Sequence, residues 1–130
     1  EHLLLLNDDM EVGTPDWMKT EAHLWLKRGV ELAAQTWDAA CSKFGWSASS
    51  VDQFICHQVG AKHLASVCKR LDLPVDKAFK TFPEFGNTGP AAIPMALSLA
   101  VEEGVVRDGH RLALMGIGSG LNVSMMDVSW

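Results

Sequence analysis

The chain has 130 residues, which suffices for one domain and is too short for two of the usual size. Apolar residues make up 48% of it and charged residues 21%, as in an ordinary globular protein. The net charge is −5 and no basic run is longer than Lys69-Arg70, so the composition argues against nucleic acid as the main partner.

The sequence shows neither a membrane span nor a secretory leader. Its longest apolar run is far below the ~18 residues of a span, and residues 3–6 are four leucines without a basic flank. Cys41, Cys56 and Cys68 form no zinc-like pattern, so we expect free thiols in a reducing, cytoplasmic protein. Because the chain begins with Glu1, we expect it to be a piece of a larger protein.

The first long element that the sequence predicts is a helix over residues 20–44. Its apolar residues recur every three or four positions and form one stripe. Thr20 is a suitable N-cap, and Gly45 is a suitable stop just past the end. Residues 1–19 form a lead-in that is hard to assign, with a strand end at 1–6 and turns at 7–9 and 13–16.

A buried strand over residues 51–57 comes next and runs into the turn His57-Gln58-Val59-Gly60. A helix over residues 60–71 follows, and Pro74 ends any continuation. One face of this helix is apolar and consists of Leu64, Val67, Cys68 and Leu71.

The second half of the chain begins with residues 74–87, which are mostly irregular. Residues 88–103 then predict a helix rich in small residues, able to pack close to a neighbour. Pro94 lacks a backbone N–H, so we expect a kink or an irregular first turn. Gly104 ends this helix.

Two strands complete the chain, over residues 111–117 and 121–130, with a sharp glycine turn at 116–120 between them. So short a connection requires an antiparallel hairpin. Helices that alternate with buried strands predict an α/β layered domain with a mixed sheet.

His57 is the first candidate site residue, because it stands at the carboxyl end of a strand, where open α/β sheets bind ligands. The plain alternative is a core histidine with one satisfied hydrogen bond. Free N–H groups and the dipole at the nearby helix start disfavour imidazolium. We therefore expect a neutral His57 that could act as a donor or base near pH 7.

Asn87 repeats this pattern thirty residues later, between Gly86 and Gly89, which allow a tight turn with close backbone approach. The plain alternative is an N-cap or turn asparagine. We interpret His57 and Asn87 as two halves of one site. Together with two helix N-termini they would cradle negative charge on a carbonyl oxygen.

The glycine turn could contribute backbone N–H groups to the same site. In the functional interpretation, an N–H around Gly118, Ser119 and Gly120 donates to a thioester oxygen. The alternative is a simple hairpin turn that needs positive φ. A strand and not a helix follows the turn, so it is no dinucleotide fingerprint.

The sequence offers no convincing nucleophile. Cys56 is adjacent to His57 on a strand, so their side chains point to opposite faces and form no dyad. We read Cys56 as a small core residue, and Cys41 and Cys68 likewise. Ser119 has no evident Asp-His partners. The site therefore has charge-stabilising groups but lacks an attacking group.

Lys62, just past the histidine turn, is either a solvated charge or a contact to an anionic substrate arm or carrier. The spacing of His23, His63 and His110 suggests surface or helix-face residues and no metal site.

Three motifs together resemble the C-terminal half of a β-ketoacyl-acyl-carrier-protein synthase III of the thiolase superfamily. They are the Cys-His-Gln-Val-Gly motif at 56–60, the Gly-Asn-Thr-Gly-Pro motif at 86–90 and the Gly-Ile-Gly-Ser-Gly-Leu motif at 116–121. The resemblance covers residues 20–130 and implies one C-terminal thiolase-like domain with a lead-in. The histidine and glycine motifs are similar to those of the branch that joins two acyl chains head to head in olefin biosynthesis.

The resemblance implies a mechanism. A cysteine thiolate takes an acyl group from coenzyme A or a carrier protein, a second thioester becomes an enolate, and Claisen condensation gives a β-ketoacyl product. His57 and Asn87 match the residues that hold the enolate-forming thioester oxygen. The backbone near Ser119 matches the loop at the acyl-cysteine oxygen, and Lys62 a basic position used in carrier docking.

The resemblance further implies a cytoplasmic homodimer of fatty acid biosynthesis, with acyl-CoA or acyl-carrier protein as substrate and no cofactor. The family's nucleophilic cysteine lies in an N-terminal half that this sequence does not contain. We therefore expect the chain to be inactive alone and to expose apolar surface that this half would cover. The alternatives are a non-catalytic domain that binds an acyl thioester or a partner protein, and a serine or cysteine hydrolase.

Overall fold

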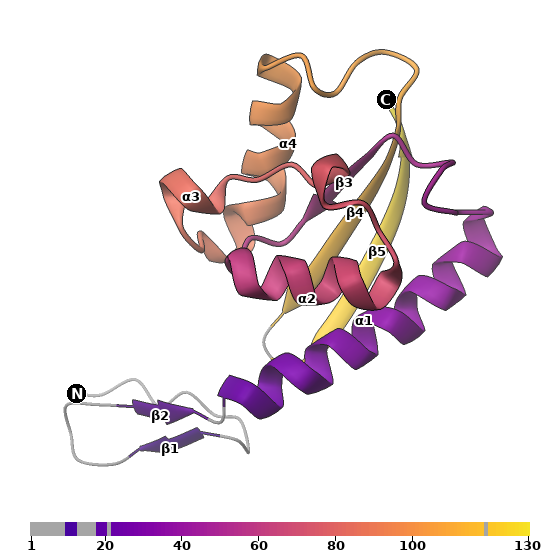
Figure 1. The fold of residues 1–130 in the computed structure, drawn as a ribbon. Coiled ribbons are helices and arrows are strands. Elements are labelled where there is room, and N and C mark those ends of the chain that lie inside the picture. The colour runs from indigo at the N-terminus through magenta and orange to yellow at the C-terminus, as the bar shows by residue number, and fades with distance from the viewer. Residues whose placement is uncertain (1–9, 13–17, 21, 119) are drawn as a thin grey trace.

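The computed structural model describes residues 10–12, 18–20, 22–118 and 120–130. Its larger sheet contains three strands in the order β3 (Gln53–Cys56), β4 (Arg111–Gly118) and β5 (Asn122–Ser129) (Figure 1). β3 pairs with β4 in parallel, and β4 pairs with β5 antiparallel. The predicted α/β class, mixed sheet and C-terminal hairpin are therefore confirmed.

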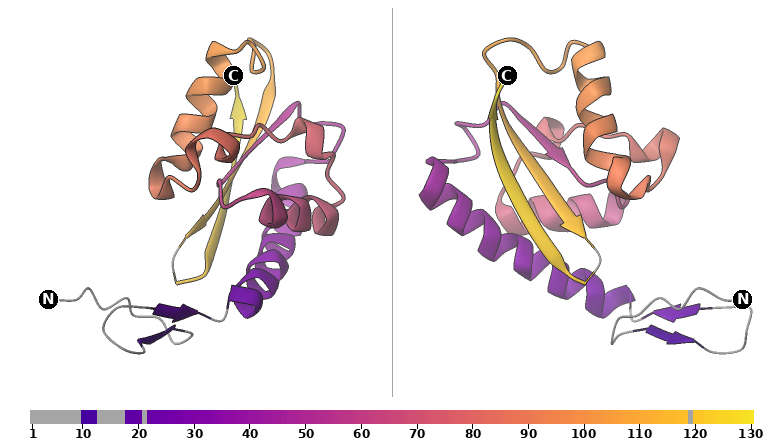
Figure 2. Two further views of the ribbon diagram at one scale, coloured as in Figure 1. Left: turned by 60° about the vertical axis from the view of Figure 1, so that its left-hand side comes forward. Right: turned by 180° about the vertical axis from the view of Figure 1, so that it is seen from behind.

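Helices cover both faces of this sheet (Figure 2). α1 (Ala22–Phe44) and α2 (Ala61–Leu71) pack on one face, and α4 (Ala92–Glu102) packs on the other. Side chains on β3 alternate between the two cores: Phe54 and Cys56 join α1 and α2, whereas Ile55 joins α4. This alternation explains why residues 54–56 of β3 are all apolar, since neither side chains on one face nor those on the other meet water there.

The core under α1 and α2 is built around aromatic rings. The Trp37 ring on α1 lies 5.4 Å from that of Trp46 and 6.0 Å from that of Phe54 on β3. α2 turns its predicted apolar face into this core, and Leu64, Val67, Cys68 and Leu71 are all buried. The helical periodicity therefore located this face correctly.

The N-terminal part differs from the prediction. β1 (Met10–Val12) and β2 (Met18–Thr20) form a short antiparallel pair in which Thr20 lies opposite Met10. Because Thr20 belongs to a strand and α1 begins only at Ala22, Thr20 as the N-cap is wrong. The expected strand end at 1–6 and the turns at 7–9 and 13–16 lie outside the described residues.

Glycine ends α1 as predicted, since Gly45 has a φ of +68° and its N–H donates to the carbonyl of Cys41 at 2.9 Å. Gly104, also with a φ of +68°, follows α4. The predicted irregular first turn near Pro94 is confirmed as the 3₁₀ turn η2 (Gly89–Ala91) directly before α4. Pro94 is the third residue of α4, where its missing N–H costs no helical bond.

Two short elements occupy the region expected to be mostly irregular, namely η1 (Val75–Lys77) and α3 (Phe82–Phe85). The glycine turn begins later than predicted. β4 continues to Gly118, so that Gly116 pairs with Ser124 and Gly118 with Asn122. Gly116 serves close packing instead of a turn, because an added Cβ would lie 3.2 Å from Ser124 Oγ and 3.4 Å from Ile93 Cδ1.

Several large apolar side chains are between 41% and 60% exposed; they are Val59, Val75, Phe85, Met126 and Trp130. Among the described residues, no helix has the length and apolarity of a membrane span.

Candidate active site

His57 directly follows β3, and the sheet fixes its backbone. Its N–H donates to the carbonyl of Met115 at 2.9 Å, which extends the parallel ladder between β3 and β4 by one bond. The imidazole is partly buried, and this burial lowers the pKa of His57 below its ordinary value of 6.5. A neutral His57 near pH 7 agrees with the prediction, and burial is the cause of the lowered pKa.

Asn87 follows α3 and is reached through Gly86, whose φ of +66° and ψ of −153° suit glycine. Asn87 Oδ1 accepts a hydrogen bond from the N–H of Gly89 at 3.0 Å. The oxygen of the Asn87 side chain therefore behaves as in the alternative interpretation, in which Asn87 is a turn asparagine. The Nδ2 amide group remains as the donor that could face a ligand.

His57 and Asn87 line one cavity of about 490 Å³. The hairpin of β4 and β5 supplies half of the lining residues, and Gly118 is one of them. The complete lining consists of His57, Asn87, Gly89, Pro90, Ile93, Gly116, Ile117, Gly118, Asn122 and Ser124. The fold thus brings together the carboxyl end of β3, the start of η2 and the hairpin end of β4 and β5.

The remaining predicted site residues lie elsewhere. Lys62 is exposed on the first turn of α2 and Gly120 lies in the hairpin turn; neither lines the cavity. Ser119 lies outside the described residues. The roles of all six predicted residues stay predictions, since geometry alone does not assign a role.

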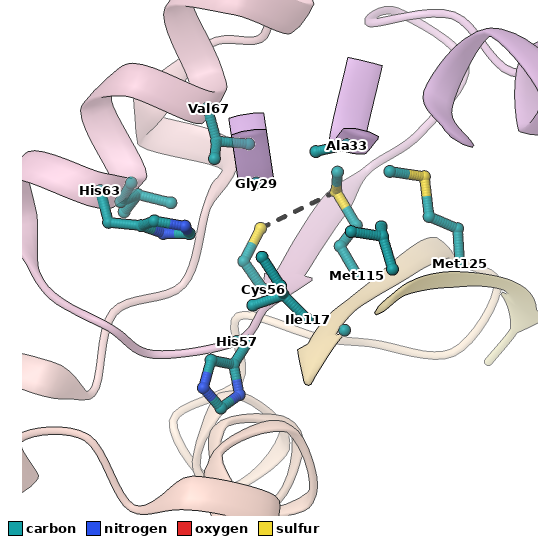
Figure 3. Close-up of a pocket in the computed structure, with 12 residues that line it drawn as sticks. Gly29, Ala33, Cys56, His57, His63, Val67, Met115, Ile117 and Met125 are labelled. Carbon is teal, nitrogen blue, oxygen red and sulfur yellow. Dashed lines mark hydrogen bonds between the residues drawn. The ribbon is translucent and has the colours of Figure 1, made fainter. Parts of the chain in front are cut away.

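A second, smaller cavity lies between α1, α2 and the sheet and is lined almost entirely by apolar groups (Figure 3). Its walls include Gly29, Ala33, Val67 and Met125, and His57 borders it as well. His57 therefore stands at the boundary between an apolar pocket and a more polar one.

Cys56 faces the apolar cavity, with its thiol 3.8 Å from the sulfur of Met115 (Figure 3). The imidazole of His57 points away from this thiol, as expected for neighbours on a strand. Burial, followed by the nearby Cys68, raises the pKa of Cys56 to about 12. A thiol that resists ionisation is a poor nucleophile, so the core interpretation of Cys56 is confirmed.

His63 on α2 also borders the apolar cavity. Its pKa is lowered first by burial and then by the charge that His57 would carry if protonated. Both histidines therefore favour the neutral form, and none of the described residues forms a cluster of three His, Cys, Asp or Glu side chains able to hold a metal.

Two polar residues of the cavity wall, Asn122 and Ser124, were not among the residues predicted from the sequence. They stand two positions apart on β5 and so project on the same face. Alternation along β5 could have grouped them, but only the pairing with Gly118 and Gly116 brings them to the cavity that His57 lines.

The sequence profile of the family described as "3-Oxoacyl-[acyl-carrier-protein (ACP)] synthase III C terminal" matches residues 41–130. The chain is 43% identical over 118 residues to an acyl-CoA:acyl-CoA alkyltransferase of Xanthomonas campestris pv. campestris, covering 91% of this chain and 35% of that protein. It is 39% identical to the protein of that name in Shewanella oneidensis, covering 88% and 33%.

Solved structures give the same picture. Xanthomonas campestris OleA with bound lauric acid and lauroyl-CoA superposes with a TM-score of 0.83 at 43% identity, covering 92% of this chain and 35% of that one. The 3-oxoacyl-(acyl carrier protein) synthase III FabH of Xanthomonas oryzae gives 0.85 at 42%, covering 94% and 36%. This chain spans about a third of the length of these relatives.

Proposed function

The chain belongs to the family of 3-oxoacyl-[acyl-carrier-protein] synthase III C-terminal domains, and we propose that it forms the C-terminal part of an enzyme that condenses two acyl thioesters. The observation that carries this proposal is the meeting of His57 and Asn87 on one cavity at the carboxyl end of β3. Similarity to two acyl-CoA:acyl-CoA alkyltransferases favours fatty acyl-CoA as the substrate class.

In this proposal the imidazole N–H of His57 and the amide Nδ2 of Asn87 donate to the oxygen of the thioester that becomes an enolate. The negative charge that develops on this oxygen is stabilised by two fixed donors in a partly buried site. The neutral state of His57 near pH 7 fits this role, because a neutral imidazole donates through one nitrogen without carrying a counter-charge.

The nucleophile comes from the remainder of the protein. Cys41, Cys56 and Cys68 have raised pKa values, burial being the leading cause in each, and none of them lines the cavity that holds Asn87. A cysteine thiolate there accepts the acyl group as the thiolate of the first thioester leaves. The second thioester becomes an enolate by losing an α-proton to a base or by losing CO₂, and its enolate carbon then attacks the carbonyl of the acyl-cysteine. The carbon–carbon bond forms as the cysteine sulfur leaves.

The remaining assignments complete the proposal. Backbone N–H groups near Gly118, Ser119 and Gly120 bind the oxygen of the acyl-cysteine, and exposed Lys62 contacts an anionic substrate arm or carrier. The complete enzyme is a cytoplasmic homodimer that requires no cofactor. The 130 residues alone do not condense acyl groups.

The test uses the full-length protein with a fatty acyl-CoA. Intact mass spectrometry measures acyl loading, and product analysis measures condensation. We expect His57→Ala and Asn87→Ala to abolish condensation while loading persists. His110→Ala, at the opposite end of β4, is the matched control and should retain both. Loss of loading in both site variants would contradict the role proposed for these residues.

The second candidate is a non-catalytic domain that binds an acyl thioester or a partner protein. A full-length wild-type protein that binds acyl-CoA without forming an adduct or a product would favour it. Acylation of the 130-residue piece, removed by mutation of one of its own cysteines, would contradict both candidates and indicate a self-sufficient acyltransferase.

A further inference from the structure

Gln58, the residue after His57, is among the most buried polar side chains of the described residues. It is 1% exposed, and its amide makes four hydrogen bonds. Nε2 donates to the carbonyls of Cys56 at 2.9 Å and Phe79 at 3.2 Å. Oε1 accepts from the N–H groups of Thr81 at 3.0 Å and Phe82 at 3.2 Å. Both donors and both acceptor positions of the amide are therefore used.

These four partners belong to two segments of the chain. Cys56 ends β3, which carries His57. Phe79, Thr81 and Phe82 lead into α3, whose last residue is two positions before Asn87. The amide of Gln58 thus spans the gap between the two segments that supply the candidate active-site side chains.

Phe79 is also tied to β3 directly, because its N–H donates to the carbonyl of Phe54 at 3.2 Å. Beyond Phe79, within the described part of the chain, no hydrogen bond other than those of Gln58 ties residues 80–87 to β3 or its carboxyl end. The remaining bonds of α3 are local, from Glu84 and Phe85 to Thr81 and from Gly86 to Phe82. The sheet holds His57 through Met115, so its position does not depend on α3. On its C-terminal side Asn87 is held by α4, which packs on β3 through residues such as Ile93 and Ala96. On its N-terminal side its position relative to His57 depends on Gln58 and on the packing of Phe82 against the core.

We propose that Gln58 is a positioning residue, whose amide holds α3 against the end of β3 and so sets the distance between the donors of His57 and Asn87. The inference rests on the proposed function of that pair. Only a primary amide offers two donors and two acceptors on one planar group. Gln58→Met keeps the length of the side chain but leaves two carbonyls and two N–H groups unpaired.

The test compares Gln58→Met with Val51→Ala in the full-length protein. Val51 is fully buried just before β3, away from the cavity, so its truncation destabilises the fold without touching the bridge. We expect Gln58→Met to lower the kcat of condensation by about 10- to 100-fold, as small misplacements of reacting groups do, with acyl loading unchanged. Val51→Ala should lower the melting temperature but leave kcat near the wild-type value.

The pH dependence of condensation by Gln58→Glu distinguishes a positioning role from a merely structural one. An ionised carboxylate faces the carbonyls of Cys56 and Phe79 without a donor, whereas the protonated acid restores one O–H donor. Relative to the wild type at each pH, condensation by Gln58→Glu should therefore recover as the pH is lowered. The variant also keeps the proposal testable if Gln58→Met does not fold.

Wild-type kcat in folded Gln58→Met, or a pH profile of Gln58→Glu parallel to the wild type, would overturn the proposal. Crystal structures of the wild type and Gln58→Met separate this outcome from failure of the proposed function. A shifted Asn87 with an unchanged ladder between β3 and β4 supports positioning even if the wild type does not condense acyl groups. An unmoved Asn87 overturns it.

Discussion

The indole N–H of Trp46 donates a 2.8 Å hydrogen bond to the carboxylate of Asp127, which lies 81 residues further along the chain. The same carboxylate receives Arg111 Nε at 2.9 Å and a second guanidinium nitrogen at 3.0 Å. Arg111 also donates to the carbonyl of Phe44 at the end of α1. One carboxylate thus joins the loop after α1 to β4 and β5.

This arrangement predicts a pH-dependent contribution to stability from Asp127. Its pKa is lowered, first by Arg111 and then by Trp46. The unfolded chain therefore binds a proton at a higher pH than the folded chain, and the contribution is present above the unfolded value of about 3.9. It is lost as the pH falls from there through the lower folded pKa.

We expect Asp127→Asn to be less stable than the wild type at pH 7, because it loses the charge-assisted bonds to Arg111. The difference in the free energy of unfolding should begin to shrink as the pH falls below about 4, where the unfolded carboxylate takes up a proton, and should vanish only once the folded carboxylate is also protonated at a lower pH. Urea denaturation between pH 2 and pH 7 measures this. Asp108→Asn removes an exposed carboxylate and is the control. A constant difference between wild type and Asp127→Asn would contradict the prediction.

A second prediction concerns the two histidines beside the apolar cavity. Burial and the charge of His57 both lower the pKa of His63, so His57→Gln should raise it. The pKa of His63 in this variant should still lie below the ordinary value of 6.5, because the burial of His63 is unchanged. Titration of the imidazole signals by NMR measures the pKa of His63 in the wild type and in His57→Gln, with His110→Gln as the control. An unchanged His63 titration in His57→Gln would show that the two rings are not coupled.

The lowered pKa values of His57 and His63 also determine how the stability of the fold changes with pH. Below about pH 6.5 the unfolded chain protonates His57 and His63 more readily than the folded chain, so stability falls as the pH is lowered. Replacing His57 by Gln should weaken this fall between pH 7 and pH 5. Thermal unfolding in that range provides the measurement, and a steeper fall in the variant would contradict the argument.

Gly86 supports a third prediction, since its φ of +66° and ψ of −153° lie in a region that other residues rarely adopt. Gly86→Ala should lower the free energy of unfolding by about 1–3 kcal/mol. It should also lower condensation, because relief of the strain moves Asn87.

Gly104→Ala is the matched control for this backbone effect. Gly104 has a φ of +68° and follows α4, and an added Cβ meets no atom within 4 Å, as at Gly86. We expect this variant to lose about 1 kcal/mol of stability and to keep wild-type condensation. Equal losses of activity in both variants would mean that stability alone explains the effect of Gly86→Ala.

The cysteines give the fourth prediction. With a pKa of about 12, Cys56 is almost wholly a thiol at pH 8, so iodoacetamide should not modify it in the folded protein. Buried Cys68 should also resist, and partly exposed Cys41 should react first. Peptide mapping after alkylation, with urea-unfolded protein as the control, tests this order. Rapid native alkylation of Cys56 would contradict its place in the core.

Local patterns were sufficient for much of the fold. The apolar face of α2 and the glycine after α1 depend on residues a few positions apart, and both were predicted correctly. Thr20 was misassigned because a threonine before a helix suits a cap as well as a strand, and its pairing with Met10 decides between them. Gly116 was predicted both as a strand residue and as the start of the turn; its place in β4, packed against Ile93, depends on a tertiary contact.

For the candidate site, too, local features could be predicted from the sequence, whereas features that depend on tertiary packing could not. His57 and Asn87 could be selected from the sequence, because each stands at a transition between elements. That they line one cavity was assumed, since it depends on how β3, η2 and β4 pack. The four bonds of Gln58 were invisible, because three of its partners lie 21 to 24 residues away.

The parallel pairing of β3 with β4 has a consequence for biosynthesis. Cys56 leaves the ribosome long before its partner Met115, which follows 59 residues later. Until β4 is synthesised, the apolar residues Phe54, Ile55 and Cys56 lack this strand partner, and an apolar segment without its partner is prone to aggregation. Slow or interrupted translation between the two strands therefore lengthens the interval in which this apolar segment has no partner strand.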